Sequence, residues 1–289
     1  METGHRAGVM VRVQTIEWQV AGACNYDCSY CIQSRKYRKG RPHRDNIESA
    51  LSFFASLPGS WEIKCSGGEA FAHPLFMEQI VPGLMDRTDH RISILTNFSA
   101  SVPELFRFAA MTRGRLSVFS ASFHTEYVKA EAFAKKAAWF QDLLELDSRV
   151  VINQVVLPGK EGEAARCRDV FVSKGLAWFP QLYKSKGHVV DYPDEVALRT
   201  LIGDRPGPRQ ANLAPSYQGR MCWAGVDYLV VDKDGNAWSC RTAKRGGEGL
   251  LGNVFSGAVQ RWSNPSPCPY DVCPCTVPAN RGMIEGVSP

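Results

Sequence analysis

The 289-residue sequence predicts an α/β fold with parallel strands, because apolar or β-branched segments alternate six times with amphipathic segments of helical length. Six strand–helix units are fewer than the eight that close a (β/α)8 barrel. The ten cysteines are unevenly spread, and five of them follow residue 221. We therefore expect a strand–helix domain at 14–183, a linker at 184–216 and a small cysteine-rich domain at 217–289.

The strands of the first domain are expected at residues 15–20, 62–65, 91–95, 116–122, 149–156 and 177–182. Helices are expected between them, at 45–57, 74–85, 101–111, 129–146 and 162–174. Residues 1–13 are expected to form a loose leader. The linker is rich in glycine and proline around 203–208 and holds one short helix near 194–201. In the last region, the Asp234-Gly235 turn between two apolar strands predicts a hairpin.

Composition excludes several classes of protein. An apolar content of 44% supports a sizeable core, and the chain has no run of 18 apolar residues that would predict a membrane span. Residues 1–13 contain no apolar signal segment, so the protein is expected to be cytoplasmic. Ten cysteines in that compartment indicate metal or redox chemistry rather than disulfides. The net charge of +5 is too small to indicate nucleic acid binding.

Three cysteines follow the first strand, in the segment Cys24-Asn25-Tyr26-Asp27-Cys28-Ser29-Tyr30-Cys31. A loop with this C-x3-C-x2-C spacing can place three thiolates around one face of a [4Fe–4S] cluster, which four cysteines normally hold. Because no fourth cysteine lies nearby, one iron would keep an open position for a substrate or cofactor. The alternatives are a zinc knuckle, which usually needs four ligands in two pairs, and a set of free buried thiols.

A glycine-rich turn, Ser66-Gly67-Gly68-Glu69, ends the second strand. Two glycines allow positive φ and a close approach of the backbone to a ligand. Glu69 is expected at the C-terminal mouth of the strands, where the active sites of such folds collect. His124 follows the fourth strand and is either structural or a substrate contact.

Together, the cysteine loop and the glycine-rich turn resemble the signature of the radical S-adenosylmethionine (SAM) enzymes. The resemblance implies a partial (β/α)6 barrel of TIM-barrel type, open along one side. It implies that the three cysteines hold a [4Fe–4S] cluster whose open iron chelates the amino and carboxylate groups of SAM. The reduced cluster would cleave SAM to a 5′-deoxyadenosyl radical, which takes a hydrogen atom from the substrate.

The same resemblance implies several cofactor contacts. Tyr30 would lie near the adenine, the turn of Ser66, Gly67, Gly68 and Glu69 would bind the SAM amino group, and Ser122 would contact the ribose. Polar residues at other strand ends are further candidates, although such side chains often only satisfy loop backbone: Asn97, Asn153 and Gln154.

The cysteines of the last region are Cys222, Cys240, Cys268, Cys273 and Cys275. Such a dense set in a region with little core indicates a metal, either zinc in a ribbon-like site or an iron–sulfur cluster. The order of Cys222, Gly225, Cys240 and the segment 251–254 resembles the start of the SPASM and twitch domains of the same family. Five cysteines fit the shorter twitch form, which implies one auxiliary [4Fe–4S] cluster.

We expect Cys222, Cys240, Cys273 and Cys275 to be the auxiliary ligands. Cys268 would be either a ligand or a spare thiol that returns a hydrogen atom to a substrate radical. Two further cysteines are expected to pack as small apolar residues, Cys65 and Cys167.

The leading functional hypothesis is a radical SAM oxidoreductase or epimerase that acts on a polar, sugar- or aminocyclitol-like natural-product precursor. The chain is similar to the twitch-type aminocyclitol dehydrogenases and sugar epimerases of aminoglycoside pathways. The short segment before the first strand is expected to leave no room for a peptide-recognition domain, which favours a small molecule. The alternatives are a peptide-modifying epimerase or crosslinking enzyme and, from another class, a non-catalytic iron–sulfur or zinc protein.

A basic segment follows the cysteine loop and contains Arg35, Lys36, Arg38, Lys39, Arg41, His43 and Arg44. It is either a solvated loop, a docking face for an acidic electron donor of the flavodoxin or ferredoxin type, or a site for a phosphorylated substrate.

Overall fold

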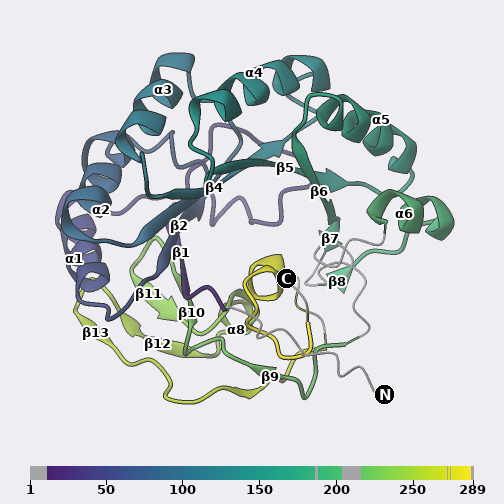
Figure 1. The fold of residues 1–289 in the computed structure, drawn as a ribbon. Helices are drawn as coiled ribbons and strands as arrows, with labels where there is room; N and C mark the ends of the chain where they lie inside the picture. Colours follow the sequence, from purple (N-terminus) through teal and green to yellow (C-terminus); the bar gives the residue numbers. More distant parts are fainter. Residues whose placement is uncertain (1–11, 186–187, 204–215, 272, 274, 288–289) are drawn as a thin grey trace, which may run out of the picture.

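The computed structural model describes residues 12–185, 188–203, 216–271, 273 and 275–287. Residues 1–11 of the expected leader and 204–215 of the expected linker lie outside the described residues. In the described part of the chain, helices surround a curved sheet (Figure 1). No helix there is long and apolar enough to cross a membrane.

Six parallel strands form most of a ten-stranded sheet and follow one another in chain order. They are β1 (Thr15–Ala21), β2 (Glu62–Gly67), β3 (Arg91–Thr96), β4 (Leu116–Phe123), β5 (Arg149–Val156) and β6 (Ala177–Leu182). The expected strand positions are confirmed to within about two residues at each end, which is the usual precision of such boundaries. The curved arc of these strands confirms the expected partial barrel (Figure 1).

The helices that follow the strands cover the outer face of the sheet (Figure 1). They are α1 (Arg44–Ala55), α2 (Val81–Arg87), α3 (Val102–Met111), α4 (Ala130–Leu143), α5 (Glu161–Val172) and α6 (Glu195–Ile202), with a π-helix, Phe76–Ile80, before α2. The ring of Trp18 in β1 packs edge-on against Phe54 of α1, with centroids 5.0 Å apart. Alternate residues of β1 therefore face the helices.

The C-terminal region continues the same sheet rather than forming a separate one. Strand β10 (Tyr228–Val231) pairs in parallel with β1 and antiparallel with β11 (Asn236–Trp238), which confirms the predicted hairpin. Strands β12 (Leu250–Asn253) and β13 (Ala258–Val259) extend it further. Four short strands lie outside this sheet as two pairs, β7 (Lys184–Ser185) with β8 (His188–Val189) and β9 (Met221–Cys222) with β14 (Ser266–Pro267).

Two short helices were not predicted, α8 (Arg241–Gly246) and α9 (Thr276–Asn280). Both have too few residues to show a helical periodicity. Helix α9 lies within the arc of the barrel strands (Figure 1). Gln181 of β6 donates a hydrogen bond to Thr276 of α9, 3.3 Å away. The C-terminal region therefore fills part of the barrel interior.

The inner face of β1 and β2 is polar, because Glu17 and Gln19 alternate with apolar residues of β1, and Glu62 and Lys64 with those of β2. These four side chains are all buried. The Arg281 guanidinium, just after α9, donates two hydrogen bonds to Glu62, at 2.6 and 3.2 Å. Buried charges are thus matched between the barrel and the C-terminal region.

Candidate iron–sulfur and SAM site

The cysteine loop follows β1 directly and leaves its three thiols in different environments. Cys28 is buried, Cys24 is half-buried and Cys31 is exposed. The amide of Tyr26 donates to Cys24 Sγ at 3.4 Å, and the amide of Cys31 donates to the carbonyl of Cys28 at 3.1 Å. The loop is therefore folded back on itself, with its last thiol open to solvent.

The glycine-rich turn packs directly against the start of the cysteine loop. The amide of Gly68 donates to the carbonyl of Ala21 at 2.7 Å, and the amide of Glu69 donates to that of Ala23 at 3.0 Å. A Cβ atom at Gly67 would lie 2.2 Å from the Ala21 oxygen, and one at Gly68 would lie 2.0 Å from the Ala23 oxygen. Only glycine permits this approach, so the two motifs that were separate in the sequence form one structural unit.

Glu69 is 1% exposed, and its carboxylate accepts three hydrogen bonds from described residues. Thr96 Oγ1 and the amide of Phe71 donate to one oxygen, at 2.6 and 3.2 Å, and the amide of Asn97 donates to the other at 2.6 Å. Burial raises the pKa of Glu69, while these hydrogen bonds act to lower it. Glu69 thus ties the glycine-rich turn to the end of β3.

Asn97 connects the end of β3 to the cysteine loop. Its side-chain nitrogen lies 2.8 Å from Asn25 Oδ1 and 3.9 Å from Cys24 Sγ. Asn97 is therefore at the mouth, next to one of the predicted cluster ligands, Cys24.

The segment after β4 contacts the other side of the cysteine loop. Nδ1 of His124 lies 3.4 Å from Cys28 Sγ and 2.9 Å from the Tyr30 hydroxyl. The Glu126 carboxylate accepts hydrogen bonds from both the amide and the hydroxyl of Ser29. This placement makes His124 a neighbour of the predicted cluster rather than an isolated residue.

Tyr127, in the same segment, also contacts the cysteine loop. Its hydroxyl accepts from the amide of Asp27 at 2.6 Å, and its ring stacks on Tyr26 with centroids 3.8 Å apart. Sequence reasoning missed both Glu126 and Tyr127. The signal that could have found them is their position just after a parallel strand, at the edge where the other site residues lie.

The remaining predicted SAM contacts divide into two groups. Ser122 and Asn153 are paired across β4 and β5 and are half-buried near the strand ends. Gln154, in contrast, accepts a hydrogen bond from the indole nitrogen of buried Trp178 at 3.0 Å and also contacts Cys167 of α5. Successive strand residues face opposite sides, so Gln154 points into the helical layer and away from the place of a cofactor.

Cysteine thiolates are the ligands that hold iron–sulfur clusters, so the three thiols of the loop fit this group. Burial, followed by repulsion from Cys31, raises the pKa of Cys28 to about 11. A free thiol here stays protonated, and metal binding must displace the proton. Among the described residues, no group of three cysteine, histidine or carboxylate side chains is placed so that it could hold one metal ion. In a cubane cluster each thiolate binds a different iron, so its ligands need not converge on one point.

The five C-terminal cysteines also come together. Four of them pack against one apolar cluster that includes Tyr228 and Met283: Cys222, Cys240, Cys268 and Cys273. The Sγ atom of Cys275 lies instead 3.6 Å from the Tyr228 hydroxyl and 4.0 Å from a carboxylate oxygen of Glu17 in the barrel. Cys275 also lies within electrostatic reach of Cys273 and Cys240. Which of Cys268 and Cys275 is a ligand therefore stays a prediction. Cys65 is fully buried in the main core, as expected.

A cavity of about 950 Å³ opens beside the cysteine loop. Residues from 31–37 form one wall, residues 183–185 after β6 form another, and residues from 241–246 and 269–271 of the C-terminal region close it. Cys31 is among its lining residues. A molecule in this cavity would lie next to the predicted cluster.

Comparison with solved structures identifies the fold. Over 85% of this chain and 78% of the other, the structure matches anSMEcpe with bound AdoMet, at a TM-score of 0.59 and 15% identity. Over 86% of this chain, it matches Streptococcus suis SuiB bound to its precursor peptide SuiA, at a TM-score of 0.62 and 12% identity. This chain has the fold of the radical SAM enzymes.

The radical SAM fold is thus present at low sequence identity. The chain spans 64% of the length of SuiB. A structure of BtrN with AdoMet and 2-DOIA also matches, at a TM-score of 0.49 and 15% identity over 85% of this chain and 80% of the other. No protein-family model matches the chain, and no curated protein matches it in sequence.

Proposed function

We propose that this protein is a radical SAM enzyme that removes a hydrogen atom from an sp3 carbon of a polar small-molecule precursor. The observation that carries the proposal is the packing of the Cys24–Cys31 loop onto the Gly67-Gly68 turn, within a radical SAM fold. Cys24, Cys28 and Cys31 would hold a [4Fe–4S] cluster, which supplies the electron that cleaves SAM to the hydrogen-abstracting 5′-deoxyadenosyl radical.

In this proposal the protein's own residues position the cofactor. The Gly68 turn brings backbone within reach of a ligand, and Glu69 fixes that turn by accepting from Thr96 and Asn97. Ser122, Asn153 and the backbone of Tyr30 line the mouth where the adenosine would lie. The stacked rings of Tyr26 and Tyr127 join the cysteine loop to the segment after β4.

The test is SAM cleavage by anaerobically reconstituted, reduced protein. The wild type and a Cys167→Ala control should release 5′-deoxyadenosine, because Cys167 lies on α5 away from the loop. Cys28→Ala should abolish the product while the auxiliary iron, about four atoms, remains. No 5′-deoxyadenosine from the wild type, or full product from Cys28→Ala, would remove the enzyme proposal.

The outcome for the substrate, dehydrogenation or epimerisation, depends on the fate of the carbon radical. In dehydrogenation the carbon radical of an alcohol loses one further electron and a proton and becomes a ketone, which requires an electron acceptor such as the auxiliary cluster. In epimerisation a thiol returns a hydrogen atom to the opposite face. Turnover in D2O separates the two: deuterium at the carbon supports return from a thiol, and an oxidised product without it supports dehydrogenation.

A peptide-modifying epimerase or crosslinking enzyme is the second candidate. Its support is that SuiB was solved with the precursor peptide SuiA and anSMEcpe with the Cp18Cys peptide, both on this fold. The presence of a peptide gene beside the coding sequence, and its product's mass change on incubation, would favour this candidate over the small-molecule one.

We propose one auxiliary [4Fe–4S] cluster held by Cys222, Cys240, Cys268 and Cys273. These four cysteines share an apolar surround, in which thiolates bound to iron are shielded from water. Cys275 would be the additional thiol, since it faces Glu17 and Tyr228 inside the barrel. It replaces Cys268 as the candidate hydrogen-atom donor.

We further propose that an acidic electron donor of the flavodoxin or ferredoxin type docks beside Cys31. Five cations of the segment that follows that exposed thiol in the chain are themselves exposed: Arg35, Lys36, Lys39, Arg41 and Arg44. Arg38 does not belong to this face, because its side chain is 12% exposed and pairs with Asp27 at 2.5 Å. A Lys36→Glu, Lys39→Glu variant should be reduced more slowly by flavodoxin, but not by dithionite.

A further inference from the structure

The cavity beside the cysteine loop has an unbalanced charge. Four of its lining residues are cationic, Lys184, Arg241, Lys244 and Arg245. The one carboxylate among its lining residues is Asp271. Charges of one sign around a partly enclosed space concentrate their field on whatever binds there.

Arg241 and Lys244 are held in place by residues on either side of the cavity wall. Arg241 makes a two-point contact with buried Glu17, at 2.5 and 2.8 Å. Lys244 lies 3.4 Å from Asp232 and donates to Gln19 at 2.7 Å. These pairs fix the wall of the cavity but offset only part of its positive charge.

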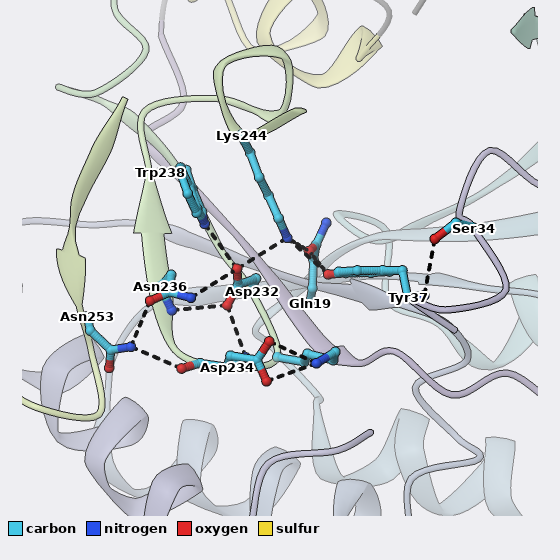
Figure 2. Close-up of polar contacts among 10 residues, drawn as sticks. Gln19, Ser34, Tyr37, Asp232, Asp234, Asn236, Trp238, Lys244 and Asn253 are labelled. Carbon is cyan, nitrogen blue, oxygen red and sulfur yellow. Dashed lines mark hydrogen bonds and ion pairs between the residues drawn. The ribbon is translucent and has the colours of Figure 1, made fainter. Parts of the chain in front are cut away.

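Figure 2 shows how the Lys244 ammonium group is positioned. It points between Asp232 of the hairpin turn on one side and Gln19 and Tyr37 on the other. The Tyr37 hydroxyl, which lies 3.0 Å from the ammonium group, also hydrogen-bonds to Gln19. Lys244 thus joins the C-terminal region to the segment that follows the cysteine loop, and the cavity wall is rigid at this point.

Arg245 has no such partner. It is exposed, it lines the cavity, and it makes no ion pair or hydrogen bond with any other described residue. Arg245 and Arg241 repel each other, and among the described residues only Arg241 has a carboxylate paired with it. An anion bound between the two guanidinium groups would offset this repulsion.

A hydroxyl group in the same wall also lacks a partner. Thr242 Oγ1 is buried and makes no hydrogen bond within the described residues. A buried hydroxyl without a partner is unfavourable, so such groups usually meet a ligand or water. It lies between the two arginines in sequence, and Thr242, Arg241 and Arg245 all line the cavity.

From this arrangement we propose that the cavity binds an oxyanion group of the substrate, a phosphate ester or a carboxylate, through Arg245, Arg241 and Thr242. Guanidinium groups match the planar or tetrahedral oxygens of such anions better than any other side chain. The inference rests on the proposed function in one respect, that the occupant of this cavity is the substrate. It narrows that function, because the cavity would repel a positively charged aminocyclitol and favour a sugar phosphate or a sugar acid.

Binding of simple probes to the reconstituted protein tests this without turnover. Inorganic phosphate and glucuronate are the anionic probes, and 2-deoxystreptamine is the cationic one, each titrated by calorimetry at constant ionic strength with SAM present. The anions should bind, and Arg245→Gln should weaken phosphate binding at least tenfold. Arg245→Lys should weaken it less than Arg245→Gln does, because lysine keeps the charge but lacks the forked geometry of the guanidinium group. Tighter binding of phosphate than of glucuronate would indicate a phosphate ester, and tighter binding of glucuronate would indicate a carboxylate.

The matched control is Arg113→Gln. Arg113 is an exposed arginine that pairs with Glu145 and does not line the cavity. This variant should bind phosphate as the wild type does. Equal phosphate affinity in Arg245→Gln and wild type, or tighter binding of 2-deoxystreptamine than of phosphate, would overturn the proposal.

The carboxylate of SAM is another source of an oxyanion near the cluster. If Arg245→Gln weakened SAM binding by the same factor as phosphate binding, the anion would be that of SAM and the substrate proposal would be wrong. We expect SAM affinity in this variant to stay within twofold of wild type. The release of 5′-deoxyadenosine tests the proposed radical SAM function separately. A failure of the oxyanion proposal can therefore be told apart from a failure of the proposed function.

Discussion

The Sγ atom of Cys28 lies 3.4 Å from Nδ1 of His124, although the two residues are 96 positions apart in the chain. Burial lowers the pKa of His124 to about 4, so the ring is neutral at physiological pH. A thiolate ligand can only accept a hydrogen bond, so with a cluster bound this contact requires the hydrogen on Nδ1. Hydrogen bonds to the sulfurs are one way in which a protein sets the potential of a cluster.

Replacing His124 should therefore lower the reduction potential of the cluster in the cysteine loop. If the hydrogen bond favours the reduced form by about 1 kcal/mol, His124→Phe should lower the potential by about 40 mV. EPR-monitored redox titration measures this. Tyr127→Phe is the control, because it removes a contact of the same segment with the Asp27 amide but none with a thiol. Equal potentials in His124→Phe and wild type would contradict this role.

Gly68→Ala should prevent the cysteine loop from closing on the glycine-rich turn. Its Cβ would lie 2.0 Å from the carbonyl oxygen of Ala23, which is backbone and has little room to move. We expect a loss of about 1–3 kcal/mol in the free energy of unfolding and less iron in the loop. Gly162→Ala in α5, where the nearest atom is a flexible arginine tip 3.9 Å away, should leave the iron content unchanged and should not lower the free energy of unfolding. Denaturant unfolding and iron analysis measure the two effects.

The buried pair of Glu17 and Arg241 should matter more for stability than a surface ion pair. Arg241→Met leaves the Glu17 carboxylate buried without its partner, which should cost about 3–5 kcal/mol at neutral pH. The double variant Glu17→Gln, Arg241→Met should be more stable than Arg241→Met alone, because no charge is then left unpaired. Urea unfolding at pH 7 compares the three proteins. A double variant less stable than the single one would contradict this account.

The same pair predicts how stability depends on pH. Burial alone would raise the pKa of Glu17, but attraction and hydrogen bonds from Arg241 outweigh it and lower the pKa from 4.5 to about 2. A carboxylate with a lowered folded-state pKa contributes stability above its unfolded pKa. This contribution should therefore be lost as the pH falls from about 4.5 to about 2. In Glu17→Gln, the acid-side slope of unfolding free energy against pH should be shallower across that range.

Cys268 and Cys275 should differ in their effect on the auxiliary cluster. Cys268→Ala should lose about four irons per chain, and Cys275→Ala should keep them, if Cys268 is a ligand and Cys275 faces the barrel. Iron and sulfide analysis after reconstitution measures this. The opposite pattern would restore the ligand set expected from the sequence.

The sequence predicted the parts of this structure that depend on local patterns. The six parallel strands and the hairpin at Asp234-Gly235 follow from apolar periodicity and turn chemistry, and both are confirmed. The spacing of Cys24, Cys28 and Cys31 was visible in the sequence for the same reason, since all three lie in one short loop.

Contacts between distant segments could not be predicted from the sequence. Residues far apart in the chain make three such features. These are the parallel pairing of β10 with β1, the contacts of Glu126 and Tyr127 with the cysteine loop, and the cations that line the cavity. The sequence also did not show that Gln154 contacts Trp178 on the helical side. Strand residues alternate in direction, so a shift of one position moves a side chain from one face of the sheet to the other.

The most direct test of the central claim is the EPR spectrum of the reduced protein with and without SAM. We predict a [4Fe–4S] signal from the cysteine loop that changes when SAM is added, because SAM occupies the open iron, and that is absent from Cys28→Ala. Zinc without iron in the loop of anaerobically purified protein, or a cluster signal that SAM does not alter, would contradict the account.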